Sequence, residues 1–247
     1  MTTTHLTAHA MEIGDAISTG LDSEARDYWE EHRRRIVAAM VRAGALIEGP
    51  LAGRRPVRVL DVGPSFEVML LAKLFPAARL ETMGFADDRY KPAGLAAHHP
   101  VDLNETADLA RCARVEPCDL MLFLEVIEHL RTAPVHVLRY LRECLVPGGW
   151  LILSTPNAAW LRNRWRLLCG QNPFEMIRQD ARSPGHFREY TRAEMTAQLE
   201  HAGFEIVEVR LENLYDFGSE SGRRFTRLAA SLPTTFRHDM MFVARRQ

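Results

Sequence analysis

The middle of the chain carries a group of side chains that can bind a metal ion or accept a proton. Glu125, Glu128 and His129 are spaced i, i+3 and i+4, so in a helical turn they would share one face. Two carboxylates and one imidazole suit a hard divalent cation such as Mg²⁺ or Mn²⁺, and also Zn²⁺. A further histidine, His186, lies downstream. Without a metal, either histidine could act as a general base, or both could be purely structural.

A loop after a short apolar segment has the features of a ligand site. Residues 57–62 are mostly apolar, as expected of a buried parallel strand, and helical periodicity follows over 66–75. In an open α/β sheet, ligands bind beyond the carboxyl ends of the strands, and Gly63 lets the backbone approach a ligand closely. An acid after the next strand, Asp87 or Asp88, could hold ribose hydroxyls. The alternative is a tight turn that binds nothing.

Strand-like and helix-like segments alternate along the chain. We predict strands at 57–62, 79–85, 119–124, 150–154, 204–209 and 240–244. We predict helices at 24–46, 66–75, 106–113, 134–145 and 191–202. This alternation, with short connections, predicts an α/β fold: a Rossmann-like, doubly wound, mostly parallel sheet of seven strands with helices on both faces.

The length of the chain favours one large domain, and we expect residues 1–247 to form a single unit. Residues 1–50 have the pattern of an N-terminal helical arm. Two stretches, 157–190 and 212–237, do not follow the alternation. We expect them to be lid or acceptor-binding insertions, with a helix in the lid.

The first insertion is rich in arginine and also contains tryptophan. Arg162 and Arg166 are spaced i, i+4, so one face of a helix there would be basic, and Trp160 and Trp165 are interleaved with them. A basic, aromatic lid fits an anionic acceptor such as a phosphorylated metabolite, a sugar nucleotide or an RNA end. The alternative is a solvated charged helix whose tryptophans pack on the core.

Several short motifs occur in an order that resembles the class I methyltransferases that use S-adenosylmethionine (SAM). They are DVG at 61–63, CDL at 118–120, EVIEHL at 125–130, LVPGG at 145–149, STPN at 154–157, HFREYT at 186–191 and GF at 203–204. The resemblance extends over roughly residues 57–209 and is closest to the branch that contains the ubiquinone-pathway O-methyltransferases. It implies SAM as the methyl donor and an oxygen atom as the acceptor.

The same resemblance assigns the donor site. It implies that Asp61 and Gly63 line the methionine part of SAM and that an acid near Asp87 binds the ribose. It also implies that Asp102 and Leu103 flank the adenine. The expected SAM-binding residues are Asp61, Gly63, Pro64, Ser65, Asp87, Asp102, Leu103 and Glu125.

The glycine loop departs from the family pattern D-x-G-x-G-x-G. Ser65 and Glu67 occupy the second and third glycine positions, and Ala86 stands where the ribose-binding acid often falls. SAM carries no phosphate and does not need a complete anion-binding glycine loop. The altered loop nevertheless leaves a non-catalytic scaffold of the same fold as an alternative.

The E-x-x-E-H segment with its later histidine resembles the metal site of small-RNA terminal 2′-O-methyltransferases. By that resemblance the metal ligands are Glu125, Glu128, His129 and His186. We expect methyl transfer from SAM to an oxygen of a small, anionic metabolite or glycan intermediate, with His129 or His186 as the catalytic base. A metal-dependent RNA 2′-O-methyltransferase is the alternative.

The composition of the chain limits the kinds of molecule that the protein is expected to bind. The 247 residues have a net charge of −1 and no recognisable RNA-binding appendage, so we expect a small-molecule acceptor and no nucleic acid. The four cysteines show no C-x-x-C spacing, and the first residues lack an apolar signal region, so we expect a reduced, cytoplasmic protein. No apolar run is long enough to span a membrane. These patterns say nothing about the oligomeric state.

Overall fold

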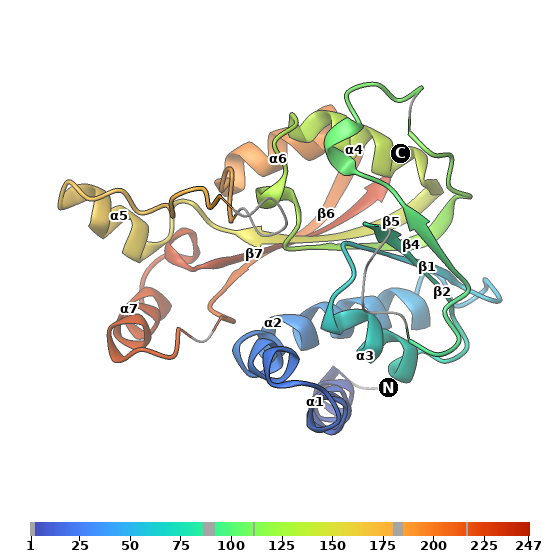
Figure 1. Cartoon of the computed structure of the whole chain (residues 1–247), viewed down its shortest axis with the longest axis horizontal. Helices are drawn as coiled ribbons and strands as arrows, with labels where there is room; N and C mark the ends of the chain where they lie inside the picture. The colour runs from blue at the N-terminus through green and yellow to red at the C-terminus, as the bar shows by residue number, and fades with distance from the viewer. Residues whose placement is uncertain (1–2, 86–91, 111, 180–184, 216) are drawn as a thin grey trace.

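The centre of the molecule is a single mixed β-sheet. The computed structural model describes residues 3–85, 92–110, 112–179, 185–215 and 217–247 (Figure 1). Within them, seven strands pair in the order β3-β2-β1-β4-β5-β7-β6. They are β1 (Arg58–Val62), β2 (Arg79–Gly84), β3 (Ala97–Pro100), β4 (Cys118–Leu124), β5 (Leu145–Pro156), β6 (Phe204–Glu212) and β7 (Asp239–Arg246). Only β7 runs antiparallel to its neighbours, so the expected Rossmann-like, mostly parallel sheet is confirmed.

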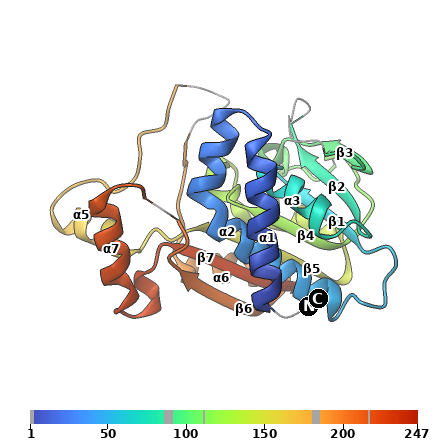
Figure 2. The ribbon, with the colours of Figure 1, turned by 90° about the horizontal axis from the view of Figure 1, so that it is seen from below.

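Helices cover both faces of this sheet, as expected. They are α1 (Thr3–Thr19), α2 (Ser23–Glu48), α3 (Phe66–Leu74), α4 (Pro134–Glu143), α5 (Leu161–Leu168), α6 (Arg192–His201) and α7 (Glu220–Ala230). Three short 3₁₀ helices are η1 (Leu103–Glu105), η2 (Ile127–His129) and η3 (Thr234–Phe236). One face carries α1, α2 and α3, and the other carries α4 and α6 (Figures 1 and 2). The remaining helices, α5 and α7, fall inside the two segments expected to be insertions.

The central strand β4 shows why a continuous apolar run forms a buried strand. All seven of its residues are buried. Leu120 and Leu122 belong to the core cluster under α2 and α3, whereas Met121 and Phe123 belong to the cluster under α4 and α6. Successive side chains alternate between the two faces of a strand, so a strand covered on both sides is apolar at successive positions, here from Leu120 to Leu124. The buried Asp119 near its start is paired with Arg54.

The N-terminal arm is part of the core. The ring of Trp29 on α2 stacks on Phe66 at the start of α3, with centroids 4.7 Å apart. Its indole nitrogen donates a hydrogen bond to the Asp15 carboxylate of α1 at 2.8 Å. A methyl group on Gly14 would lie 2.1 Å from the Trp29 ring, so α1 approaches α2 this closely only with glycine there. Contacts with α1 and α3 therefore hold α2 against the sheet.

Two expectations about local structure need correction. Strand β3, which pairs with β2, was not predicted, because its sequence lacks an apolar alternation. His98 and His99 hydrogen-bond to Thr82 and Glu81 of β2. The helix predicted at 106–113 is absent from its described residues, which form turns after η1. Here the Asp108 carboxylate accepts from the backbone of residue 110, and such local bonds compete with helix formation.

Candidate active site

The order of strands reverses between β1 and β4, which are neighbours in the sheet although β2 and β3 lie between them in the chain. The backbone turns sharply after both strands: φ is 74° at Gly63 and 55° at Glu125. A positive φ is easy for glycine but strained for glutamate, and strained residues cluster at functional sites. The two turns lie at the carboxyl edge, where ligands bind in open α/β sheets.

Gly63 lines a small, mostly apolar cavity together with the two residues expected to flank adenine, Asp102 and Leu103. The other lining residues are Met83, Gly84, Phe85, Val101, Val126 and Leu130. A methyl group on Gly63 would lie 2.5 Å from Cγ2 of Val126, so this wall requires glycine. A mostly apolar cleft with one carboxylate suits a flat heterocycle attached to a polar sugar.

The other expected donor-site residues lie where β1 meets α3. Asp61 is fully buried at the end of β1, and Pro64 is buried as well. Ser65 is half-buried at the N-cap of α3. The expected ribose-binding residue, Asp87, and its neighbour Asp88 lie outside the described residues.

Helix α2 adds a buried cation that the motifs did not indicate. The guanidinium of Arg35 lies 2.9 Å from Oε2 of Glu125. Although burial alone would lower the pKa of Arg35, the nearby Glu125 and Tyr28 raise it. Glu67, which replaces the third glycine of the family loop, is also buried, and burial raises the pKa of its carboxyl above the usual range despite the Arg35 charge. A permanently charged guanidinium therefore lies among acidic groups at the reversal point.

Both carboxylate oxygens of Glu125 are occupied. Besides the ion pair to α2, its Oε1 accepts a hydrogen bond from the Ser154 hydroxyl at 2.7 Å. Glu125 precedes η2 and has a left-handed backbone, so the helical turn assumed for the i, i+3, i+4 spacing does not include it. Among the described residues, the group with converging ligand atoms contains Glu128, His129 and His186 and does not contain Glu125.

Glu128, His129 and His186 offer ligand atoms that all lie within 4.8 Å of one another. Glu128 is completely buried, and its Oε2 accepts a hydrogen bond from the Thr155 hydroxyl at 2.9 Å. Its Oε1 has no hydrogen-bond partner in the part of the chain that the structure describes. Burial, together with the charge of Glu125, raises the pKa of the Glu128 carboxyl. A buried, unpaired carboxylate oxygen fits either a bound cation or a proton.

Each histidine ring is held through Nδ1. The Nδ1 of His129 lies 2.9 Å from the carbonyl oxygen of Gly185, and because a carbonyl only accepts, this nitrogen carries the hydrogen. The Nδ1 of His186 lies 3.0 Å from a carboxylate oxygen of Glu189. In the neutral rings, Nε2 is then the acceptor. The same arrangement serves both catalytic bases and metal-binding histidines.

The two histidines differ in basicity. Burial lowers the pKa of His129, the hydrogen bond to Gly185 only partly offsets this, and the nearby His186 lowers the pKa further. Burial acts in the same direction on His186, but Glu189 and Glu128 outweigh it and raise its pKa. The rings contact each other edge to face, with centroids 4.8 Å apart. His129 is therefore the ring that stays neutral more readily and can accept a proton.

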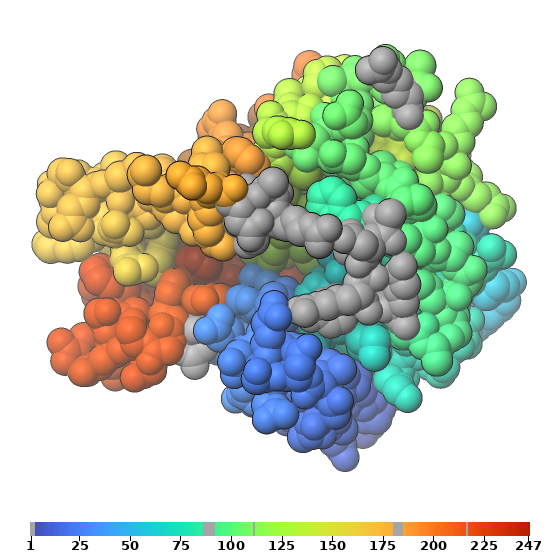
Figure 3. Space-filling model, in the orientation of Figure 1, coloured from blue at the N-terminus to red at the C-terminus, as the bar shows by residue number. Residues whose placement is uncertain are grey.

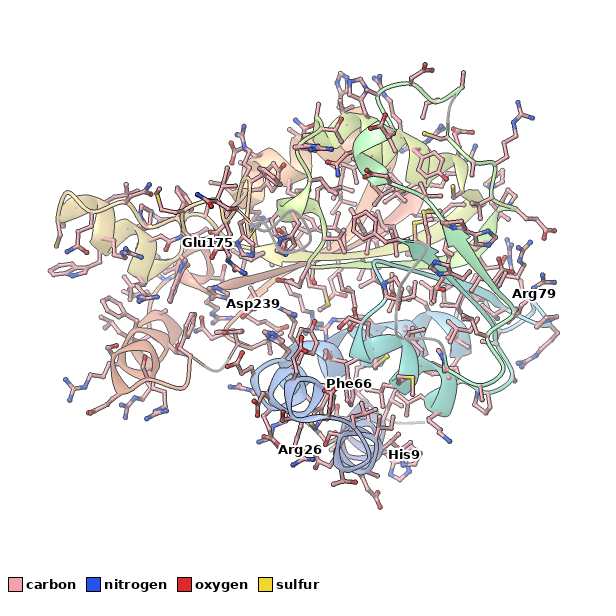
Figure 4. The ribbon with its side chains drawn as sticks, viewed as in Figure 1. His9, Arg26, Phe66, Arg79, Glu175 and Asp239 are labelled. Carbon is pink, nitrogen blue, oxygen red and sulfur yellow. The ribbon has the colours of Figure 1, made fainter. Side chains whose placement is uncertain are left out.

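A cavity of about 660 Å³ opens beside these histidines. Aromatic side chains in its walls are Tyr28, Trp160, Phe174, Tyr215 and Phe217. The rings of Trp160 and Phe217, one from each insertion, stack with centroids 4.9 Å apart. Arg162 and Arg166 of α5 line the same cavity, as does Glu175, which Figure 4 places between the α5 segment and the sheet. The two insertions therefore enclose the space next to the candidate base with aromatic rings and with charged side chains of both signs, three arginines and two glutamates.

Sequence reasoning missed part of this site. Tyr28 and Arg35 come from α2, where no motif marks them, and they line the larger cavity only because α2 packs across the sheet. Glu189 lies inside the HFREYT motif, three residues after His186, so its spacing could have indicated a partner for that ring. Of the two tryptophans that the alternative placed on the core, Trp160 is buried, whereas Trp165 is 54% exposed.

The remaining sequence expectations concern cysteines and membrane spans. All four cysteines are free: Cys112, Cys118, Cys144 and Cys169. Within the described residues, no helix is both long enough and apolar enough to cross a bilayer.

The fold and the family model that matches the chain identify a class I SAM-dependent methyltransferase. A family model described as a methyltransferase domain matches residues 28–209, and the chain belongs to this family. A search of curated proteins found no significant match.

Solved structures share the fold at low sequence identity. A SAM-dependent methyltransferase from Archaeoglobus fulgidus is 18% identical, with a TM-score of 0.57 over 91% of this chain and 100% of that one. A Haloferax volcanii complex of the Trm112 methyltransferase activator and a methyltransferase matches at 14% identity and TM-score 0.57, over 94% of this chain and 96% of that one. The 1,6-didemethyltoxoflavin N1-methyltransferase of Burkholderia thailandensis, with bound 1,6-didemethyltoxoflavin and S-adenosylhomocysteine, is 17% identical, with TM-score 0.51 over 98% of this chain and 90% of that one.

Proposed function

We propose that this protein transfers the methyl group of SAM to a hydroxyl oxygen of a small, anionic metabolite or glycan intermediate, with His129 as the general base. The observation that carries the proposal is the acceptor nitrogen of His129, held in a ring kept neutral by burial beside a cavity of about 660 Å³. The acceptor hydroxyl would give its proton to Nε2 of His129 while its oxygen attacks the methyl carbon. The carbon–sulfur bond breaks, its electron pair stays on sulfur, and S-adenosylhomocysteine leaves.

The donor would lie along the carboxyl edge between β1 and β4. Its adenine would enter the cavity that Gly63 shares with Asp102 and Leu103. Its methionine part would approach the junction of β1 and α3, where Arg35 offers a cation for a carboxylate and Glu67 an acid for an ammonium group. The Burkholderia enzyme transfers to nitrogen, so the choice of oxygen rests on the base and the motifs of this chain.

The glycine after β1 provides the test of the donor site. Gly63→Ala should raise the Kd for SAM at least about tenfold, because the new methyl group collides with Val126 at the cavity wall. Isothermal titration with SAM measures the change. Gly94→Ala is the matched control: φ there is also positive, at 85°, so the backbone strain of about 1–2 kcal/mol is similar, but no atom of the described residues lies within 4 Å of the added carbon. Equal SAM affinity in both variants would contradict the assignment.

The arginines of α5 provide the test of the anionic acceptor. Arg162→Glu combined with Arg166→Glu should raise the acceptor KM at least about tenfold, since two repulsive charges replace two attractive ones in the cavity wall. SAM affinity should stay unchanged. The control exchanges Arg26 and Arg139 for glutamate, because both are exposed and neither lines the cavity. If the acceptor KM responds equally to both pairs, these arginines form only a solvated face.

A divalent cation at Glu128, His129 and His186 is a second candidate arrangement, and the unpaired Glu128 Oε1 favours it. Such an ion would lower the pKa of the acceptor hydroxyl, and it would extend the candidates to the ribose 2′-hydroxyl of RNA. Nδ1 of each histidine already has a partner, which leaves Nε2 to coordinate.

Removal of metal separates the two arrangements. If the cation is required, EDTA should abolish activity and added Mn²⁺ or Zn²⁺ should restore it. Elemental analysis should then find the ion in wild-type protein and a loss of at least about tenfold in Glu128→Gln, because the variant lacks the anionic ligand. Full activity in metal-free protein would rule the cation out and leave His129 as an unassisted base.

A further inference from the structure

Helix α5 presents its apolar side to solvent. The residue of this helix that is buried is Asn163, whose amide donates to the Ala158 carbonyl and the Glu189 carboxylate. Trp165 and Leu168 lie on the opposite side of the helix, and their exposed fractions are 54% and 78%. An amphipathic helix normally buries its apolar stripe, so this orientation calls for a partner that covers Trp165 and Leu168.

The segment after α5 also exposes apolar side chains. Met176 and Ile177 are 86% and 55% exposed. The α5 segment and α7 stand out from the body of the molecule as one lobe (Figure 3, yellow and orange-red). We call the exposed apolar residues of this lobe the outer apolar surface: Trp165, Leu167, Leu168, Phe174, Met176, Ile177 and Leu228. No other described segment covers them.

Exposed arginines lie on the same lobe, and two of them, Arg223 and Arg227 of α7, line a separate pocket together with Arg34 and Tyr215. Helix α7 contacts α5 and lies beside it in both ribbon views (Figures 1 and 2). It presents Arg223, Arg224 and Arg227 to solvent, and α5 adds the exposed Arg164. The whole chain has a net charge of −1, so the lobe concentrates cations that the rest of the protein balances with acids.

We propose that the lobe formed by α5, the segment after it and α7 docks onto an anionic membrane surface. Exposed tryptophan, leucine, methionine and isoleucine beside arginines match the composition of interfacial elements, whose apolar side chains enter the headgroup region while guanidinium groups meet lipid phosphates. Arginines alone would serve an RNA equally well, but RNA offers nothing to cover Leu168 and Met176.

Vesicle flotation of the full chain tests the docking without any substrate. The protein should float with vesicles of phosphatidylcholine and phosphatidylglycerol and much less with phosphatidylcholine alone. Trp165→Ser combined with Leu168→Ser should lower the bound fraction at least about tenfold, since the inserted side chains are lost. The matched control is Leu109→Ser combined with Val207→Ser, because these residues are exposed to a similar degree, 49% and 54%, away from the lobe.

A second variant tests the contribution of the arginines to vesicle binding. Arg223→Gln combined with Arg227→Gln should weaken binding to the anionic vesicles by about 30-fold, as each arginine near such a surface contributes about 1 kcal/mol. Arg26→Gln combined with Arg55→Gln is the control, since both residues are exposed outside the lobe; Figure 4 labels Arg26 on α2. Unchanged thermal unfolding shows that each variant is folded.

Four results would overturn the docking. Wild-type protein that remains at the bottom of the gradient with anionic vesicles excludes it. Equal flotation of wild type and the Trp165 and Leu168 variant excludes a role for the outer apolar surface. If the protein does not bind vesicles but binds a short RNA, the surface serves RNA instead. If it forms a dimer that the same two substitutions abolish, the surface binds a second copy of the chain.

Discussion

Replacement of His129 by asparagine should lower kcat by about a hundredfold or more, which is the usual contribution of a general base. The asparagine amide can still donate to the Gly185 carbonyl, so the loop keeps its hydrogen bond, but no nitrogen remains to accept a proton from the acceptor. SAM affinity should stay near the wild-type value, because the His129 side chain does not line the cavity proposed for the adenine. Single-turnover methyl transfer from labelled SAM measures the rate. His136→Asn, on the distant helix α4, is the control.

The pH profile separates His129 from His186 as the base. A base must be neutral, so activity falls as the pH drops through its pKa. The pKa of His129 is lowered, so kcat/KM should stay level down to pH values below about 6.5, the ordinary value for histidine, before it falls. The pKa of His186 is raised, and with that ring as base the fall would begin above about 6.5. If His129→Asn keeps the wild-type turnover and kcat/KM begins to fall at a pH above about 6.5, His186 is the base instead.

The second large effect is expected at Arg35. Arg35→Met should destabilise the protein by about 3–5 kcal/mol, because it leaves Glu125 and Glu67 buried without their cation. SAM affinity should also fall if the guanidinium holds the donor carboxylate. Urea unfolding and SAM titration measure the two effects. Arg34→Met is the matched control, because this neighbouring arginine of α2 is exposed.

A double variant identifies the cause. If the loss comes from the uncompensated carboxylate, Arg35→Met combined with Glu125→Gln should recover part of the stability, because the remaining amide can still accept from the Ser154 hydroxyl. If the stability loss of the double variant instead equals the sum of the losses of the two single variants, Arg35 acts through packing alone. SAM affinity should not recover with the stability, since the donor would still lack its cation.

The order of the elements could be predicted from the sequence because their local patterns are strong. The apolar run of β4 follows from burial on both faces of the sheet. The helical spacing of apolar residues in α3 follows from burial of one face of the helix. The edge strand β3 could not be predicted, because it lacks apolar alternation and instead carries His98 and His99, whose side chains hydrogen-bond to β2. Turn-forming side chains likewise overrode the helical pattern at 106–113.

The residue types of the site were visible in the sequence, but the direction of each side chain was not. Chemistry and spacing indicated Glu128, His129 and His186, and the fold brings them together. Glu125 shares their motif, yet a φ of 55° removes it from the turn and directs it to Arg35, 90 positions earlier in the chain. Local spacing carries no information about contacts between distant segments. Only the packing of α2 across the sheet decides which acid is neutralised and which remains with the histidines.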